Sequence, residues 1–423
     1  MKIILIYLLF ITFYIDQVLG PVGFSLKGLS LFNLNIYLML LLWALPVIQR
    51  RQPMLQVNNV NKYIISMGIV IMFSAFVKIL KAEIPDVSIL GEIIIFKTWL
   101  NPVLLFFILF NIINDEETCN KTLFGLCLLV FVLILTQLLA TFGITNYGAR
   151  SIERFGRVGG FGAAGEYAIT LALLLPFVLS ISFLAKKGFI VKFVGRILVF
   201  LILMGLVNAG SRNGAVTLLC SLTVYLVLLK REKIMGFIPI VLLATMMIVV
   251  GTAAFLASPS GVKEVVTERF DPTTAEDVDE LTSGRTDLWK NGWKLFIESP
   301  LWGHGNNTFK ELSRLKGYPR YGHPHNEYLK HLAENGVIGF SVFLLIFYKI
   351  YQNVQRALSA TGNRWQKLLY LSYLSGLISF MVGIFATNTG PSLYLFWIYT
   401  GIIYKYIQLE KNKEESIGEA MIA

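Results

Sequence analysis

The chain has 423 residues, of which 55% are hydrophobic and only 15% are charged. A mean hydropathy of +0.65 is far above that of a soluble globular protein of this length, which excludes a cytosolic domain. The 37 Lys and Arg against 26 Asp and Glu leave a formal net charge of +11, which suits a nucleic acid, an anionic lipid or an anionic substrate. The three cysteines lie in or beside apolar stretches, so we expect neither a disulfide framework nor a CxxC metal site.

The apolar residues fall into about twelve blocks of about 18 to 22 residues, the length of a helix that crosses the ~30 Å hydrocarbon core of a membrane. Neither a solenoid repeat nor a low-complexity linker separates them. We therefore expect an all-α, polytopic membrane protein with about twelve transmembrane helices, in which residues 1–423 form a single membrane domain. The blocks are residues 3–19, 30–48, 63–80, 93–113, 122–143, 166–185, 189–208, 212–229, 235–257, 336–355, 368–386 and 392–408.

Lys and Arg in the short loops predict the orientation, because such residues are retained on the cytoplasmic side. Four basic clusters alternate as an even number of helices with both termini inside requires: Arg50, Arg51 and Lys62; Lys186 and Lys187; Lys230, Arg231 and Lys233; Arg356, Arg364 and Lys367. The same alternation puts residues 144–165 and 258–335 outside. Residues 258–335 form a large outer loop, periplasmic or extracellular, between the ninth and tenth predicted helices.

The composition of the outer loop 258–335 shows where the positive charge of the chain lies and where its chemistry is expected. It carries ten Lys and Arg and twelve Asp and Glu, so the positive net charge of the chain comes mainly from the cytoplasmic loops. Nucleic acid is therefore excluded as a partner. The loop also holds all four histidines of the chain, beside a run of basic residues, which makes it the expected place of catalysis. These histidines are His304, His323, His325 and His331.

A short amphipathic helix is predicted within the loop, between Ser283 and Pro300. Apolar residues from Leu288 to Phe296 recur at spacings of three and four, and Pro300 ends the run. Its tryptophans are typical of a helix that lies at the headgroup level of a membrane, where a purely structural role is the commoner one. Arg285 at the start of this helix is the better functional candidate.

The sequence His323-Pro324-His325-Asn326 predicts an extended turn that leads into a helix. Proline keeps the residue before it extended, and Asn326 can cap a short helix that ends at Asn335-Gly336. Three interpretations compete for His325: a zinc ligand together with His323, a solvated loop residue, or a general acid or base. The zinc site lacks a third ligand at a recognised spacing. An imidazole titrates near neutral pH, which favours the acid–base role.

Two further basic sites are predicted at outer helix ends. Arg212 opens the eighth apolar block within a run of small and polar residues, where it is either a snorkelling structural arginine or a bidentate ligand for a diphosphate. Arg154 and Arg157, with Arg150, precede Gly159-Gly160-Phe161-Gly162, a glycine-rich stretch whose backbone amides can approach an anion.

Taken together, these motifs resemble the bacterial O-antigen ligase and O-antigen polymerase superfamily of polytopic glycosyltransferases. The resemblance covers the C-terminal two thirds of the chain and is carried by the order of the motifs. The matching stretches are residues 154–162, Ser211-Arg212, residues 284–289, residues 300–305 with Phe309, and residues 325–329 with Glu334, Gly336 and Gly339.

The resemblance implies a glycosyltransferase of the bacterial inner membrane, with its active site on the outer, periplasmic face. Its donor is an undecaprenyl-diphosphate-linked glycan, and its acceptor is a glycan or the lipid A core. Membrane lipid and a chain-length regulator are further implied partners. The resemblance assigns His325 as the catalytic residue and Arg212 and Arg285 as contacts of the diphosphate; Arg154, Arg157 and His323 join them as predicted substrate-binding residues.

The chemistry of the residues agrees with this assignment. Transfer from a polyprenyl diphosphate needs a base at the acceptor hydroxyl and positive charge at the leaving diphosphate. His325 can be the base, and the arginines can take the place of a metal ion. We therefore expect an inverting, single-step enzyme that uses neither a cofactor nor a metal.

Three functions remain open at this point. We favour an O-antigen or surface polysaccharide polymerase, with an O-antigen ligase that transfers the finished glycan as the alternative. A flippase for lipid-linked oligosaccharides also has about twelve helices and binds a diphosphate. However, transporters gather ionisable groups near the bilayer midplane, whereas the histidines here are predicted at the outer surface.

Overall fold

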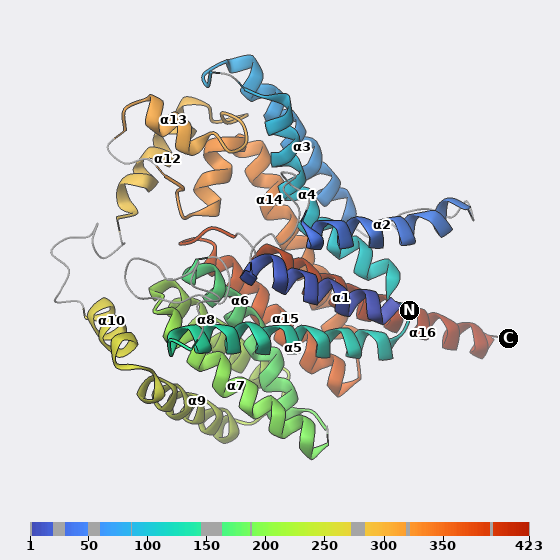
Figure 1. Ribbon diagram of the computed structural model, residues 1–423. Coiled ribbons are helices and arrows are strands. Elements are labelled where there is room, and N and C mark those ends of the chain that lie inside the picture. The colour runs from blue at the N-terminus through green and yellow to red at the C-terminus, as the bar shows by residue number, and fades with distance from the viewer. Residues whose placement is uncertain are drawn as a thin grey trace.

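The protein is built from helices, as Figure 1 shows. This computed structural model describes residues 2–19, 30–49, 60–85, 87–144, 163–186, 188–271, 284–318, 322–389 and 392–422. Within these ranges the α-helices are α1 Lys2–Tyr14, α2 Leu31–Gln49, α3 Asn61–Lys81, α4 Ile89–Ile112, α5 Glu116–Thr141, α6 Ala164–Leu179, α7 Phe189–Ala209, α8 Arg212–Arg231, α9 Phe237–Ala257, α10 Ser260–Phe270, α12 Thr286–Glu298, α13 Phe309–Leu315, α14 Glu327–Ala360, α15 Arg364–Gly383 and α16 Ser392–Ile422. Two π-helical turns, η1 Ile15–Leu19 and η3 Ser180–Leu184, extend α1 and α6.

Each of the twelve predicted apolar blocks coincides with a helix. Eight helices among the described residues are long and apolar enough to cross a membrane: α3, α4, α5, α6 with η3, α7, α8, α9 and α14. The all-α, polytopic membrane fold is therefore confirmed, whereas the count of twelve crossings stays a prediction. In Figure 1 both ends of the chain lie on the side of the molecule opposite α10, α12 and α13, as the predicted topology requires.

Helix α6 lies at the centre of the helix bundle. It is apolar all round, and nearly all of its side chains are buried, as expected of a helix enclosed by other helices. Helices α15 and α8 approach it closely because glycines face it. A Cβ on Gly376 would lie 2.3 Å from the carbonyl oxygen of Leu173, and one on Gly214 would lie 2.5 Å from the Cβ of Ala168. Small residues at such contacts are typical of helices packed inside membranes.

The described residues of the predicted outer loop include α10, α12, α13 and the start of α14, and residues 284–318 are attached to the hairpin of α3 and α4. Buried His304 joins the two parts, because its Nδ1 lies 2.6 Å from Glu83 Oε2 in the α3–α4 connection. Lys78 of α3 forms a buried ion pair with Glu92 of α4 at 2.6 Å and approaches the backbone oxygen of Asn306. This part of the loop therefore packs on α3 and α4, whereas α10 contacts α7.

Both short helices predicted in the outer loop are confirmed. The amphipathic stretch before Pro300 forms α12, whose last helical residue is Glu298. The Asn326-capped helix forms the first part of α14, and Gly336 interrupts α14 with φ 63°. A side chain at Gly336 would lie 2.2 Å from the carbonyl oxygen of Leu301, so glycine is required there for both space and conformation.

Candidate functional site

The turn from His323 to Asn326 is held from both sides. The Asn326 side chain accepts the backbone N–H of Leu329 at 3.0 Å, which is the predicted cap. On the other side, Trp289 of α12 donates its indole N–H to the carbonyl of Pro324 at 3.1 Å. His325 between these anchors has a left-handed backbone, with φ 49°. A non-glycine residue in this conformation is uncommon and costs free energy, which the surrounding contacts must offset.

His325 is half-buried, and its environment favours the neutral imidazole. Burial lowers the pKa of His325 from 6.5 to about 4, with further lowering by the positive charge of Arg285 and by His323. Partial desolvation, together with the positive charges of Lys330 and Lys310, also lowers the pKa of His323, although its side chain is exposed. At neutral pH His325 is therefore uncharged and able to accept a proton, which is the state that a general base needs.

Arg285 is oriented by a segment near the end of the chain. Its Nη1 donates to the backbone carbonyl of Ala386, in the stretch that follows α15. We call residues 383–389, which run from the last residue of α15 onward, the post-α15 segment. A contact to a backbone oxygen fixes the plane of the guanidinium, and a fixed plane is what bidentate binding of a phosphate requires.

Arg212 lies beside the same segment. Ser211 caps α8 by accepting the N–H of Gly214, so that Arg212 is the first helical residue. The next residue, Asn213, donates to the carbonyl of Gly383 at 2.8 Å. Arg285 and the residue that follows Arg212 therefore both contact the post-α15 segment, and Arg212 and Arg285 are predicted to act together. Arg154 and Arg157 lie outside the described residues, so their predicted role stays untested.

The start of α14 is fixed on the post-α15 segment as well. The backbone N–H of Glu327 donates to Ile384 at 3.0 Å. The Glu327 carboxylate in turn accepts the backbone N–H of Thr389 at 3.0 Å. Ring contacts add to this, because Phe385 packs against Trp289 with centroids 5.6 Å apart. The post-α15 segment thus joins the first residues of α8, α12 and α14.

Sequence reasoning missed the post-α15 segment. The predicted block 368–386 runs through the first half of it, whereas α15 ends at Gly383. The sequence does contain a signal for this segment. The polar run Thr387-Asn388-Thr389, followed by Gly390-Pro391, separates the last two apolar blocks.

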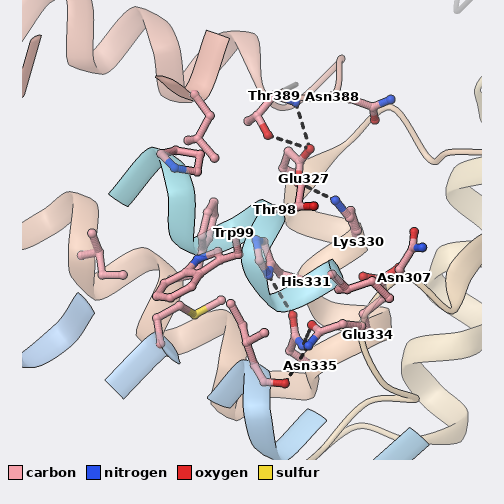
Figure 2. Close-up of a pocket in the computed structure, with 18 of the residues that line it drawn as sticks. Thr98, Trp99, Asn307, Glu327, Lys330, His331, Glu334, Asn335, Asn388 and Thr389 are labelled. Carbon is pink, nitrogen blue, oxygen red and sulfur yellow. Dashed lines mark hydrogen bonds and ion pairs between the residues drawn. The ribbon is translucent and has the colours of Figure 1, made fainter. Parts of the chain in front are cut away.

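A cavity of about 590 Å³ lies next to the post-α15 segment, between α3, α4, α14 and α16. Figure 2 shows Glu327, Lys330, His331 and Glu334 directed into it from one face of α14, with Trp99 on the facing side. Its polar lining residues are Thr98, Glu166, Asn306, Asn307, His323, Glu327, Lys330, His331, Glu334, Asn335, Asn388 and Thr389. Its apolar lining residues are Ile64, Met67, Ile71, Ile95, Trp99, Pro102, Phe343, Ile346, Phe347, Leu393, Tyr394 and Trp397.

The polar side chains of the cavity are held in place by defined contacts. Lys330 lies 3.4 Å from the second oxygen of the Glu327 carboxylate. His331 forms a hydrogen bond of 2.9 Å with Asn335 and stacks on Phe343. Glu334 accepts the backbone N–H of Phe309 at 3.3 Å. The spacing of 327, 330, 331 and 334 puts these residues on one helix face, a pattern that sequence reasoning did not use.

The four histidines do not form one site. His323 is exposed and lines the cavity, and His331 lies in the cavity wall. His325 adjoins Arg285. His304 is structural, because its Nε2 lies 2.9 Å from the carbonyl of Leu295 while its Nδ1 contacts Glu83. In the part of the chain that the structure describes, no three His, Cys, Asp or Glu side chains are grouped as a metal site needs.

The part of the chain that carries these residues is similar to a known protein family. Residues 197–344 match the sequence model of the O-antigen ligase family. The predicted resemblance is confirmed over this stretch, which includes Arg212, Arg285, His323 and His325. The rest of the chain lies outside this match.

One curated relative adds little about function. An uncharacterized protein of Haemophilus influenzae is 27% identical over 198 residues, which cover 43% of this chain and 48% of the relative. The chain thus spans about half the length of this relative. No solved structure matches the chain.

Proposed function

We propose that the protein is a membrane glycosyltransferase that moves a glycan from undecaprenyl diphosphate to an acceptor hydroxyl. The observation that carries this proposal is the position of His325, which lies in a turn anchored at Pro324 and Asn326 and close enough to Arg285 to feel its charge. A base next to a fixed positive charge is what this transfer needs, because a proton must leave the acceptor while negative charge gathers on the leaving diphosphate.

The reaction follows from these two groups. His325 accepts the proton of the acceptor hydroxyl as its oxygen attacks the anomeric carbon of the donor. The bond from that carbon to the diphosphate oxygen breaks, and Arg285 and Arg212 stabilise the charge on the released diphosphate. Attack from the face opposite the leaving group inverts the anomeric centre. Since the arginines supply the positive charge, the step needs no divalent metal.

We propose further that the enzyme lies in the bacterial inner membrane with this site on the periplasmic face. The supporting observations are the alternation of basic loops and the arrangement in Figure 1, in which α12 and α13 lie opposite the termini. Cysteines introduced at residues 290 and 357 test the orientation. An impermeant thiol reagent applied to intact spheroplasts is expected to label the first position and to spare the second.

Between the two reactions of this type, we favour polymerisation of lipid-linked repeat units over ligation to the lipid A core. A deletion strain tests the choice. Single repeats on undecaprenyl diphosphate accumulate if the protein is a polymerase, and long undecaprenyl-linked polymer accumulates if it is a ligase.

The enzymatic proposal itself is tested with the purified protein in detergent and a synthetic lipid-diphosphate glycan. Elongated or transferred glycan is expected with the natural sequence and not with His325→Ala. A flippase would be recognised by the opposite outcome, in which the His325→Ala protein still moves lipid-linked glycan across a vesicle membrane and neither protein makes a new glycosidic bond.

A further inference from the structure

The cavity beside the turn that carries His325 is lined by acidic residues, unlike a site that binds a diphosphate. Three carboxylates line it, those of Glu166, Glu327 and Glu334, and all three residues are buried. Among the described lining residues, the one Lys or Arg is Lys330, which pairs with Glu327. A diphosphate would meet three carboxyl groups here and a lysine that is already paired with one of them, so an anion of that size is disfavoured.

The same lining suits the hydroxyl groups of a sugar. Carboxylate oxygens accept hydrogen bonds, and the amides of Asn307 and Asn388 both donate and accept. The opposite wall is aromatic, with Trp99, Tyr394 and Trp397. A few polar groups that fix orientation, set against an apolar wall, are typical of sites for small organic ligands.

The position of the cavity connects it with the proposed reaction. His323 lines the cavity and is exposed, so the cavity opens beside the turn that carries His325. Thr389, which belongs to the post-α15 segment, lines it as well. A sugar in the cavity therefore lies beside the turn that carries His325, because His323 and Glu327 on either side of that residue line the cavity.

We propose that this cavity binds the terminal sugar of the acceptor, and that its carboxylates select an uncharged sugar over one that carries a carboxylate. This inference rests on the proposed glycosyl transfer, because only a transferase needs an acceptor site next to a base. It separates the two substrates by charge: the anionic end of the donor binds at the arginines, and the neutral end of the acceptor binds among the carboxylates.

The test measures binding to the full-length protein in detergent without any donor. The probes are short-chain alkyl glycosides of glucose, galactose and mannose, each paired with its uronic acid, and the readouts are tryptophan fluorescence and calorimetry. At least one neutral sugar is expected to bind, and its uronic acid is expected to bind about tenfold more weakly or worse, because one like-charge contact is added. Inorganic pyrophosphate is expected not to compete.

Two variants that change the charge of the cavity in opposite directions test the inference further. Glu334→Gln replaces a carboxylate with an amide of nearly the same shape, whose oxygen can still accept the Phe309 N–H, and is expected to reduce the preference for the neutral sugar. Lys330→Gln removes the positive charge and is expected to increase that preference. The control is Trp293→Phe, which alters an exposed ring on α12 outside the cavity and is expected to leave binding unchanged.

Several outcomes would overturn the inference: no probe binds, a uronic acid binds as well as its neutral partner, or pyrophosphate competes with the sugar. A different result would contradict the proposed function. If sugars bind with the expected charge preference but the natural protein transfers no glycan from a lipid-diphosphate donor, the cavity assignment stands and the transfer reaction is wrong.

Discussion

The carboxylate of Glu327 accepts the backbone N–H of Thr389 at 3.0 Å and its hydroxyl at 3.3 Å, across 62 residues of sequence. This pairing holds the post-α15 segment against the first turn of α14. Because Ala386 in the same segment accepts a hydrogen bond from Arg285, the pairing also sets where Arg285 lies relative to His325. The buried carboxylate of Glu327 thus connects the cavity with Arg285.

Replacing His325 with asparagine should stop transfer without unfolding the protein. Asparagine tolerates the left-handed backbone at this position but cannot act as a base near neutral pH, so we expect a loss of about 10²- to 10⁴-fold in turnover. Turnover with a lipid-diphosphate donor measures the loss, and the thermal midpoint in detergent serves as the control. A variant that retains full turnover would remove His325 from the reaction.

The pH profile of the natural protein tests the same residue. Because the pKa of His325 is lowered from 6.5 to about 4, the base stays uncharged above that value, and the acidic limb of kcat/KM should lie near pH 4 instead of near 6.5. The unfolded chain binds this proton between the two values and the folded chain does not, so this group should also lower stability as the pH falls through that window.

Arg285→Lys should reduce turnover although the charge is kept. Lysine lacks the planar fork that binds a phosphate through two parallel hydrogen bonds, so we expect a loss of about a hundredfold. The matched control is Arg314→Lys on α13, where the arginine is exposed and pairs with Glu311 one helical turn away. Equal losses in both variants would show that the effect is not specific to the site.

His304→Ala should destabilise the protein instead of blocking the chemistry. The change removes the hydrogen-bonded contacts with Glu83 and the carbonyl of Leu295 from a buried site, for which we expect a loss of about 2–4 kcal/mol in unfolding free energy. Thermal unfolding measures it, with exposed His323→Ala as the control. A His304→Ala protein of unchanged stability but without turnover would place His304 in the reaction.

Gly336→Ala should distort the kink of α14 and cost about 2–4 kcal/mol, because a methyl group would overlap the carbonyl of Leu301 in a left-handed conformation. Gly362→Ala is the matched control, since a Cβ there meets no atom within 4 Å. We expect a lowered thermal midpoint for the first variant alone.

Transfer should continue in the presence of a chelator, because the arginines supply the positive charge. The sequence contains one pair of carboxylates at Asp-x-Asp spacing, Asp277 and Asp279, outside the described residues, and such oxygen ligands suit Mg²⁺ or Mn²⁺. Activity that is lost in chelator and returns with either metal would contradict metal independence, and loss in Asp277→Asn would then locate the ion.

The positions of the apolar helices, of α12 and of the start of α14 could be predicted from the sequence because they depend on local features, whereas α10 and α13 were not predicted. Length and hydropathy mark each apolar block, and short-range signals mark the ends: Pro300 after α12, Asn326 before α14, and Gly336 at its kink. Each of these signals acts within a few residues, so no knowledge of the partners was needed.

Only the tertiary structure decided how the functional residues come together. Arg285 meets Ala386 across 101 residues and Asn213 meets Gly383 across 170, because α15 packs against α6 and α8 and so brings its end to the starts of α8 and α12. The four histidines all lie in the predicted outer loop, yet His304 is structural and His325 adjoins an arginine. Their roles follow from burial and from neighbours distant in sequence, which local patterns do not encode.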